Sequence, residues 1–350
     1  MKFVLLLEVT AIFAAYIDKK DGNGNGLNLI NVTSVNTRSV DRNGLNLINI
    51  TSVKTRSVDA CCSDANLLIC SDVSVDLAVL LSGSDINILG TDLVFDSTVE
   101  PHGFVYHNSL GDEAVITYNN KTGNMFGSLK THEDKSYAIE KCHHGHVIKE
   151  YDMASFEADQ TERSLEPVMK TLENRVEDTT TVVTYSIMFY YTQAFQDTTA
   201  DIDGFIEQVL AETNQGYINS QIPIRASKFC AEKANVEENS NVLTSFANMK
   251  QGSSSKLRNS ADAAALLVQN YDWCGMASSF TYNTGNTVSV TKKSCALGYY
   301  SFGHEIAHNM GALHNPEVSN NNVFPEGHGH LIALVRALIF IIREFLIYKS

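Results

Sequence analysis

The sequence predicts a mixed α/β protein with two domains, a β-rich one followed by one with a mixed sheet. The length of 350 residues is enough for two domains of ordinary size. The first half contains short apolar or alternating runs separated by Gly, Asn and Asp turn residues, a pattern typical of strands. The second half alternates strand-like apolar runs with amphipathic helical stripes, which is typical of an α/β arrangement.

The β-rich domain is predicted over residues 61–152. Its strand-like runs are Val73–Leu81, Gly103–Tyr106, Ala114–Tyr118 and Tyr137–Ile139. Residues 153–179 are more charged and lack long apolar runs, so we expect a linker there. Arg163 and Arg175 are candidate processing points within this linker.

The second domain is predicted over residues 180–332. Val182–Tyr191 is β-rich and indicates a buried strand, and Asp201–Tyr217 carries a helical stripe that begins with Ile202, Phe205 and Ile206. The remaining predicted elements are a strand at 222–236, a short helix at 241–249, a buried strand at 263–269, an edge strand at 288–290 and a helix that begins close to Tyr300.

A histidine-rich motif occupies this last helix. The residues from His304 to His314 have the spacing H-E-x-x-H-x-x-G-x-x-H. Residues four apart share one face of a helix, so His304 and His308 can present two imidazole nitrogens to one metal ion. Gly311 can adopt a positive φ, which lets the chain turn and bring His314 round as a third ligand.

This spacing predicts one catalytic Zn²⁺ ion. Three protein ligands leave the fourth tetrahedral position open for water, which distinguishes a catalytic zinc site from a closed structural one. Glu305 directly follows the first ligand and points beside the metal, where a general base for that water is needed. A surface helix that is rich in histidine by chance is the alternative.

The net charge limits the partners of this chain, and its N-terminal residues favour a secreted protein. The net charge of −14 argues against nucleic acid and anionic membranes as partners, because both would be repelled. Residues 1–15 resemble a secretory signal peptide, although a buried N-terminal strand is the alternative. Glycosylation sequons at Asn31, Asn49 and Asn120 agree with an extracellular location.

Residues 16–60 are expected to form a polar spacer that contains a tandem repeat. The segment 26–41 returns as 44–59 and differs only at positions 32/50 and 36/54. Two copies are too few for a solenoid, so we assign the repeat no chemistry.

The cysteines predict disulfides and one thiol left over. They are Cys61, Cys62, Cys70, Cys142, Cys230, Cys274 and Cys295, of which six can pair in an oxidising compartment. Cys142 lies beside three histidines (143, 144 and 146), and its thiolate is a candidate zymogen latch that occupies the open zinc position. In the alternative, Cys142 pairs with one of the three cysteines that precede it in the chain.

Across about 182–332 the chain resembles the reprolysin-like (adamalysin-like) metzincins. The best match is to the compact secreted subgroup that includes peptidyl-Asp metalloendopeptidase-like proteins. The residues that carry the resemblance are Tyr190-Tyr191-Thr192, Asn219-Ser220, Cys274-Gly275-Met276-Ala277, Ser294-Cys295-Ala296 and Tyr300-Ser301-Phe302-Gly303-His304-Glu305.

The resemblance implies a zinc endopeptidase that acts on polypeptides and is made as a zymogen behind a propeptide-like domain. It implies a three-layer catalytic domain, zinc ligation by His304, His308 and His314, and Glu305 as the base. It also implies that the predicted edge strand at 288–290 binds the substrate backbone by strand addition. Cys274 and Cys295 flank the loop and strand before the zinc helix, and we predict that they pair.

Two features depart from the metzincin pattern. Asn315 follows the third ligand, where relatives usually carry Asp. Metzincins also have a Met-turn downstream of this ligand, whereas the last methionine here is Met310. Residues 333–350 form an atypical aliphatic tail that is too short and too charged for a membrane span. The alternative function is therefore a catalytically impaired zinc-binding protein, or a truncated isoform, that acts by binding.

Overall fold

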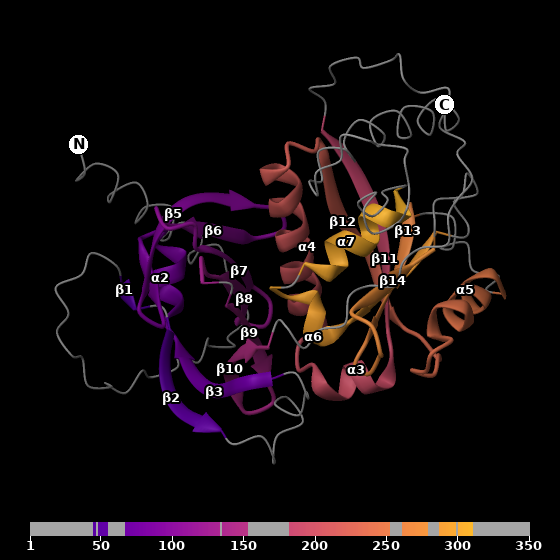
Figure 1. The fold of residues 1–350 in the computed structure, drawn as a ribbon, viewed down its shortest axis with the longest axis horizontal. Coiled ribbons are helices and arrows are strands. Elements are labelled where there is room, and N and C mark those ends of the chain that lie inside the picture. The colour runs from indigo at the N-terminus through magenta and orange to yellow at the C-terminus, as the bar shows by residue number, and fades with distance from the viewer. Residues whose placement is uncertain are drawn as a thin grey trace, which may run out of the picture.

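The computed structural model describes residues 45–46, 48–54, 67–133, 135–152, 182–252, 261–278, 287–298 and 300–310. The described residues form two β-sheets with helices packed mainly around the second one, and helix α4 (Ile202–Asn219) lies between the two parts (Figure 1). The predicted mixed α/β class is confirmed. Residues 1–44, the linker from 153 and the residues after Met310 lie outside the description.

The first domain is built on a ten-stranded sheet in the order β1-β4-β5-β6-β7-β8-β9-β10-β3-β2. Consecutive strands from β4 to β10 pair antiparallel where one follows the other in this order, as the short runs between turn residues predict. The strands are β1 (Leu45–Asn46), β2 (Ile48–Lys54), β3 (Leu67–Val75), β4 (Ile86–Ile88), β5 (Thr91–Val99), β6 (Gly103–His107), β7 (Glu113–Asn119), β8 (Asn124–Lys130), β9 (Ser136–Cys142) and β10 (Gly145–Tyr151).

Two segments of this domain differ from the sequence-based prediction. The run from Val73 to Leu81 is not one strand, because Asp76 caps a short helix, α2 (Leu77–Leu81), by accepting from Ala78 N at 3.0 Å. The second copy of the repeat contributes β1 and β2, which pair with β4 and β3. This part of the predicted spacer therefore belongs to the sheet.

The second domain contains a five-stranded mixed sheet in the order β12-β11-β13-β15-β14. The first four strands in this order are parallel and β14 is antiparallel. The strands are β11 (Val183–Tyr191), β12 (Ile224–Lys233), β13 (Ala263–Val268), β14 (Gly275–Ala277) and β15 (Val288–Lys292), and the helices are α3 (Gln193–Thr198), α4, α5 (Val242–Gly252), α6 (Lys293–Ala296) and α7 (Ser301–Asn309).

The edge strand was predicted in the wrong place. Residues 288–290 belong to β15, which lies inside the sheet with β13 on one side and β14 on the other. The strand at the edge is β14, whose three residues are too few to show an alternating pattern in the sequence.

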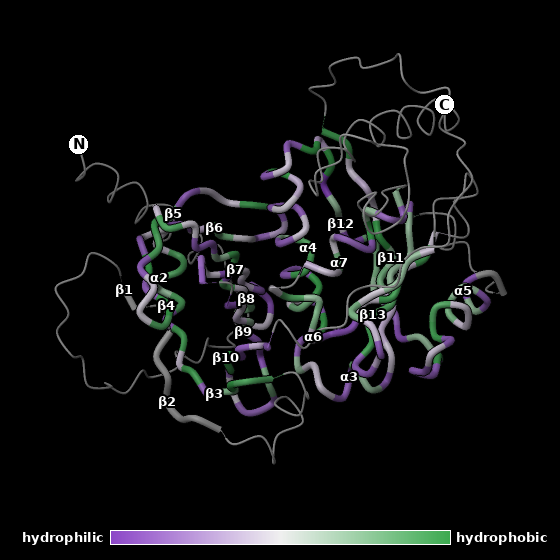
Figure 2. Tube along the Cα trace, in the orientation of Figure 1, coloured by the Kyte–Doolittle hydropathy of each residue, from purple (hydrophilic) through white to green (hydrophobic). Residues whose placement is uncertain are grey.

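The second domain has the expected three layers. Ala265 and Leu267 of β13 belong to a buried cluster with residues of α4 and α7. Ala264, Leu266 and Val268 alternate with them and belong to a cluster with α5 on the other face. Figure 2 shows the hydrophobic residues concentrated in these central strands. All six residues of β13 are buried, which explains its continuous apolar sequence.

Helix α4 carries polar side chains that find partners in both domains. Gln208 donates to Val115 O at 2.8 Å and accepts from Thr117 Oγ1 at 2.9 Å. Asn214 donates to Glu100 O at 2.8 Å and belongs to the same buried helix. Because buried polar groups are costly when unpaired, these bonds fix the first domain against the helix.

The N-terminus of α4 is held by the turn between β7 and β8. Asp201 caps the helix by accepting from Gly204 N at 2.9 Å and also accepts from Asn124 Nδ2 at 2.8 Å. Burial opposes the charge of this carboxylate, but Thr122, Asn124 and the other donors outweigh it and lower the pKa of Asp201. Asn120, the predicted glycosylation site in this turn, is exposed.

A buried ionic cluster joins the two domains. Glu140 Oε2 of β9 lies 2.9 Å from Lys149 Nζ of β10 and 3.4 Å from Lys293 Nζ of α6, and all three side chains are buried. Burial opposes the charge of Glu140, but the two ammonium groups outweigh it and lower the pKa of this carboxyl. Lys293 also donates to Thr198 O at 2.6 Å.

The structure contradicts the proposed thiol latch at Cys142. Cys142 and Cys70 are each in a disulfide, and Cys142 is buried at the end of β9. A disulfide sulfur carries no thiolate, so Cys142 is not available to a metal. The one free cysteine among the described residues is Cys230 in β12.

His146 of β10 has a structural role in the first domain. His146 Nε2 accepts from Met125 N at 3.0 Å. Burial, with a smaller contribution from Lys141, lowers the pKa of His146 to about 4. His146 is therefore neutral at pH 7.

Within the described residues, no helix has the length and apolar character needed to cross a membrane.

Substituting Glu140 with Gln is expected to destabilise the protein by about 3–5 kcal/mol, because it removes the buried negative charge that lies 2.9 Å from Lys149 and 3.4 Å from Lys293. The free energy of unfolding from urea titrations measures this effect. Glu133→Gln is the matched control, since Glu133 forms an exposed ion pair with Lys135 at 2.8 Å and its loss should change stability little. Equal effects of the two substitutions would contradict a structural role for the cluster.

His146 is expected to make stability fall at acidic pH. Its folded pKa of about 4 is below the ordinary value of 6.5, so the unfolded chain takes up the proton more readily, and stability present above pH 6.5 is lost towards pH 4. His146→Gln keeps an acceptor for Met125 N and should reduce the loss between pH 7 and pH 4.5 by about 2–3 kcal/mol. Urea titrations of chelator-treated protein measure this difference, with the exposed His144→Gln as control. The same loss in His146→Gln and the wild type would refute the assignment.

Candidate metal centre and active site

Helix α7 carries the first two predicted ligands and the predicted base. Phe302 stacks on Phe189 of β11 with ring centroids 5.3 Å apart, and Ile306 is fully buried. Before the helix, Tyr300 OH donates to Glu113 Oε1 of β7 at 3.4 Å. Tyr217 OH of α4 donates to Gly303 O at 3.3 Å. These contacts fix the position and the rotation of α7 on the sheet.

His304 and His308 converge as the motif spacing predicts. Their Nε2 atoms are 2.9 Å apart, and the rings are perpendicular with centroids separated by 4.4 Å. Two nitrogens bound to one tetrahedral zinc at about 2.0–2.1 Å would be roughly 3.3 Å apart. Two nitrogen lone pairs at such a distance repel each other unless a proton or a cation lies between them. The 2.9 Å separation is a hydrogen-bonding distance, and a small increase to roughly 3.3 Å would let both nitrogens bind one metal ion.

Glu305 lies on the side of α7 that faces β14. Its side chain is only 1% exposed. Tyr271 lies near it: burial raises the pKa of Tyr271 to about 12, and the charge of Glu305 contributes to this increase. The carboxylate is thus placed in a shielded position and follows His304, the first predicted ligand, in the sequence.

The end of α7 is attached to the two strands at one edge of the sheet, β14 and β15. Asn309 Nδ2 donates to Ser278 O, just after β14, at 3.1 Å, and to Val288 O at the start of β15 at 3.0 Å. One amide group therefore joins the helix to two neighbouring strands. The motif predicts no role for the position after the second histidine, so sequence reasoning missed this contact.

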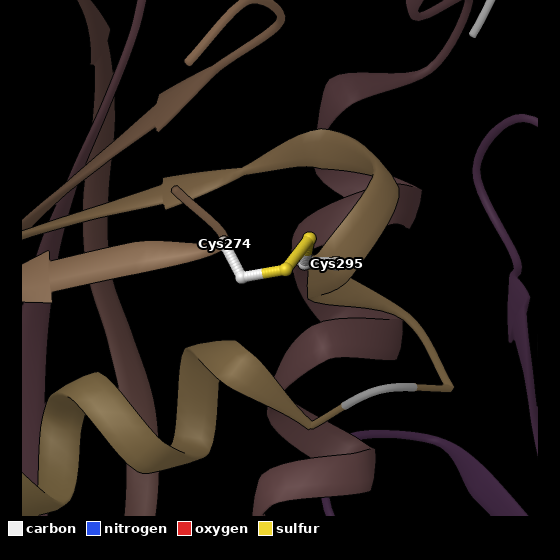
Figure 3. Close-up of a disulfide and its surroundings, with 2 residues drawn as sticks. All are labelled: Cys274 and Cys295. Atoms are coloured by element: carbon white, nitrogen blue, oxygen red, sulfur yellow. A yellow bond between two sulfur atoms is a disulfide. The ribbon is translucent and has the colours of Figure 1, made fainter. Parts of the chain in front are cut away.

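The predicted disulfide between Cys274 and Cys295 is confirmed. The two sulfur atoms are joined between the residue before β14 and helix α6 (Figure 3). Lys292 N also donates to Cys274 O at 2.9 Å. The disulfide and this hydrogen bond hold the start of β14 against the segment that leads to α7.

The remaining predicted site residues lie outside the description. These are Gly311 and His314, together with Asn315 and the sequon residue Asn31. Asn49 lies in β2.

Among the described residues, no group of three or more His, Cys, Asp or Glu side chains could hold a metal ion. His314 as the third ligand stays a prediction. Met310 is buried at the C-terminal end of α7.

Parts of this chain are similar to known proteins. A stretch of 138 residues is 32% identical to a peptidyl-Asp metalloendopeptidase of Stenotrophomonas maltophilia (strain R551-3), covering 37% of this chain and 33% of that protein. A protein of the same name from Pseudomonas fragi is 29% identical over 119 residues, which cover 34% of this chain and 62% of the relative. The chain thus matches about a third of the length of the first of these relatives.

Among solved structures, metalloproteinase-II from Bacteroides fragilis aligns with a TM-score of 0.40 and 15% identity over 78% of this chain and 88% of that one. A reprolysin model of metallo-peptidase family M12 matches residues 153–329, which is just over half of the 350 residues. The matched region contains β14, the disulfide and the complete histidine motif. The chain therefore belongs to metallo-peptidase family M12.

Proposed function

We propose that this chain is a secreted, zinc-dependent metalloendopeptidase made as a zymogen. The observation that carries the proposal is the convergence of His304 and His308, with Nε2 atoms 2.9 Å apart, beside the buried Glu305. These three residues lie next to an antiparallel strand at the edge of the sheet, in a chain of family M12. The relatives are named peptidyl-Asp metalloendopeptidases, so peptides that contain Asp are the first substrates to test.

His304, His308 and His314 would hold one zinc ion. When bound, zinc polarises a peptide carbonyl and lowers the pKa of a water molecule. Glu305 accepts the proton of the attacking water and passes it to the nitrogen of the leaving amine. Its burial against β14 keeps the carboxylate away from bulk solvent, so its proton is transferred within the site.

Strand β14 is the surface to which a substrate would be added. It pairs with β15 on one side, and in the described part of the chain it ends the five-stranded sheet. The free edge of a strand presents backbone N–H and C=O groups that can pair with an extended peptide. This assignment replaces residues 288–290, which lie inside the sheet.

The location and maturation of the chain are part of the proposal. The sequence of residues 1–15 supports secretion, and the exposure of Asn120 supports glycosylation. The β-rich domain packs against α4 as a propeptide would. The alternative is a zinc-binding protein that acts without catalysis.

Glu305→Gln is expected to retain zinc and to lose at least about 100-fold in kcat/KM, because general base catalysis contributes this much or more. Cleavage of an unstructured protein measures activity, and elemental analysis measures zinc. His308→Ala is the control for ligation and should lose both zinc and activity. Equal cleavage by the wild type and Glu305→Gln would contradict the proposal that this chain is an enzyme with Glu305 as its general base. Zinc binding without cleavage in either would favour the non-catalytic alternative.

If the substrate pairs with β14 as an added strand, N-methylation of its backbone amides should slow cleavage at alternate positions of the peptide. Alternate N–H groups of an extended peptide point towards the strand it joins, so N-methylation of those amides should lower kcat/KM at least about tenfold. Methylation of the intervening amides serves as the matched control and should have little effect. A series of singly methylated peptides measures this, and a uniform effect along the series would argue against binding at β14.

A further inference from the structure

Gly275, the first residue of β14, lies directly against Glu305. A Cβ atom at position 275 would lie 2.5 Å from Oε1, 2.6 Å from Cγ and 2.8 Å from Cδ of Glu305. Carbon atoms in contact are normally separated by about 3.5–4.0 Å, so a methyl group and this carboxylate cannot occupy these positions together. Gly275 is buried, and its φ is not in the left-handed region. The requirement for glycine is therefore one of space, not of backbone conformation.

Strand β14 cannot easily move away from the helix to make room. Cys274 is bonded to Cys295, and Cys274 O accepts from Lys292 N at 2.9 Å. Gly275 pairs with Thr291 of β15. At the other end of the strand, Ser278 O accepts from Asn309 of α7 at 3.1 Å. The strand is thus held to the rest of the domain before and after Gly275.

The side chain of Glu305 is the group that would yield. It is flexible at its end, whereas the disulfide, the sheet register and α7 are fixed by several contacts each. A side chain on residue 275 would therefore displace the carboxylate and leave the zinc ligands, which project from a different part of the helix face, in place. Glycine in a strand otherwise weakens the strand, so its presence here needs a compensating reason.

We propose that Gly275 is a positioning residue for Glu305: the missing side chain leaves the space in which the catalytic carboxylate is held. The inference rests on the proposed function and deepens it. The same strand offers its free edge to the substrate and its inner surface to the base. Glu305 is therefore placed relative to the bound peptide by direct contact with the strand that binds it.

The test compares Gly275→Ala with Gly216→Ala, each produced as the full-length protein and then activated by proteolysis. Gly216 lies in α4, and a Cβ there would meet nothing within 4 Å, so it is the same substitution without the contact. Gly275→Ala should lower kcat about 10- to 100-fold and change KM less than about threefold, with zinc content unchanged, because a displaced base loses much of its contribution. Gly216→Ala should keep the wild-type values. Wild-type kcat in Gly275→Ala would overturn the inference.

A crystal structure of Gly275→Ala gives a readout that does not depend on activity. The expected result is a different rotamer of Glu305 with unchanged backbone in β14 and α7, and a carboxylate in its original position would overturn the inference. If Gly275→Ala does not fold, the double variant with Glu305→Ala should fold, since it removes the clash, and failure of both would also overturn it. If the wild type cleaves nothing, the proposed function fails, but the crystal structure still decides the role of Gly275.

Discussion

The burial of helix α4 is the constraint on which both halves of this structure depend. Its apolar residues belong to a core shared by the second sheet and the first domain, including an edge-on contact between Phe205 and Phe126. Its polar residues must then be satisfied within the protein. Glu212 illustrates the cost of burying a charged group. Burial raises the pKa of its carboxyl to about 7, although Gly298 N donates a hydrogen bond to it at 2.9 Å. The two domains are therefore parts of one packed unit.

The candidate site follows from how α7 is placed on this unit. Contacts of Phe302 with Phe189 and of Tyr217 with Gly303 rotate the helix so that Glu305 faces the sheet. The convergence of the two histidines needs only the helix, because residues four apart share a face. The surroundings of Glu305 depend on the whole domain, since β14 is held beside Glu305 by the Cys274–Cys295 disulfide and by pairing with β15.

This difference explains what could be predicted from the sequence. Spacing of four residues is local, so the facing histidines His304 and His308 were predicted correctly, as were strands with a strong apolar pattern such as β13. Strand order and cysteine pairing depend on residues far apart in the chain. The edge was therefore assigned to residues 288–290, and Cys142 was left between a thiol latch and a disulfide, of which the structure has the disulfide. The importance of Gly275 was not visible, because it consists of the space that Glu305 fills.

Helix α7 is attached at its two ends to different parts of the protein. Near its start, Tyr300 bonds to Glu113 of the first domain, while Asn309 at its end bonds to the strands that form the edge of the second sheet. Burial and the charges of Glu212 and Glu113 raise the pKa of Tyr300, so it stays a neutral donor. Separation of the first domain would remove the partner of Tyr300 but none of the contacts of Asn309. Asn309 therefore attaches the end of the helix to the second domain, and Tyr300 links the beginning of the helix to the first domain.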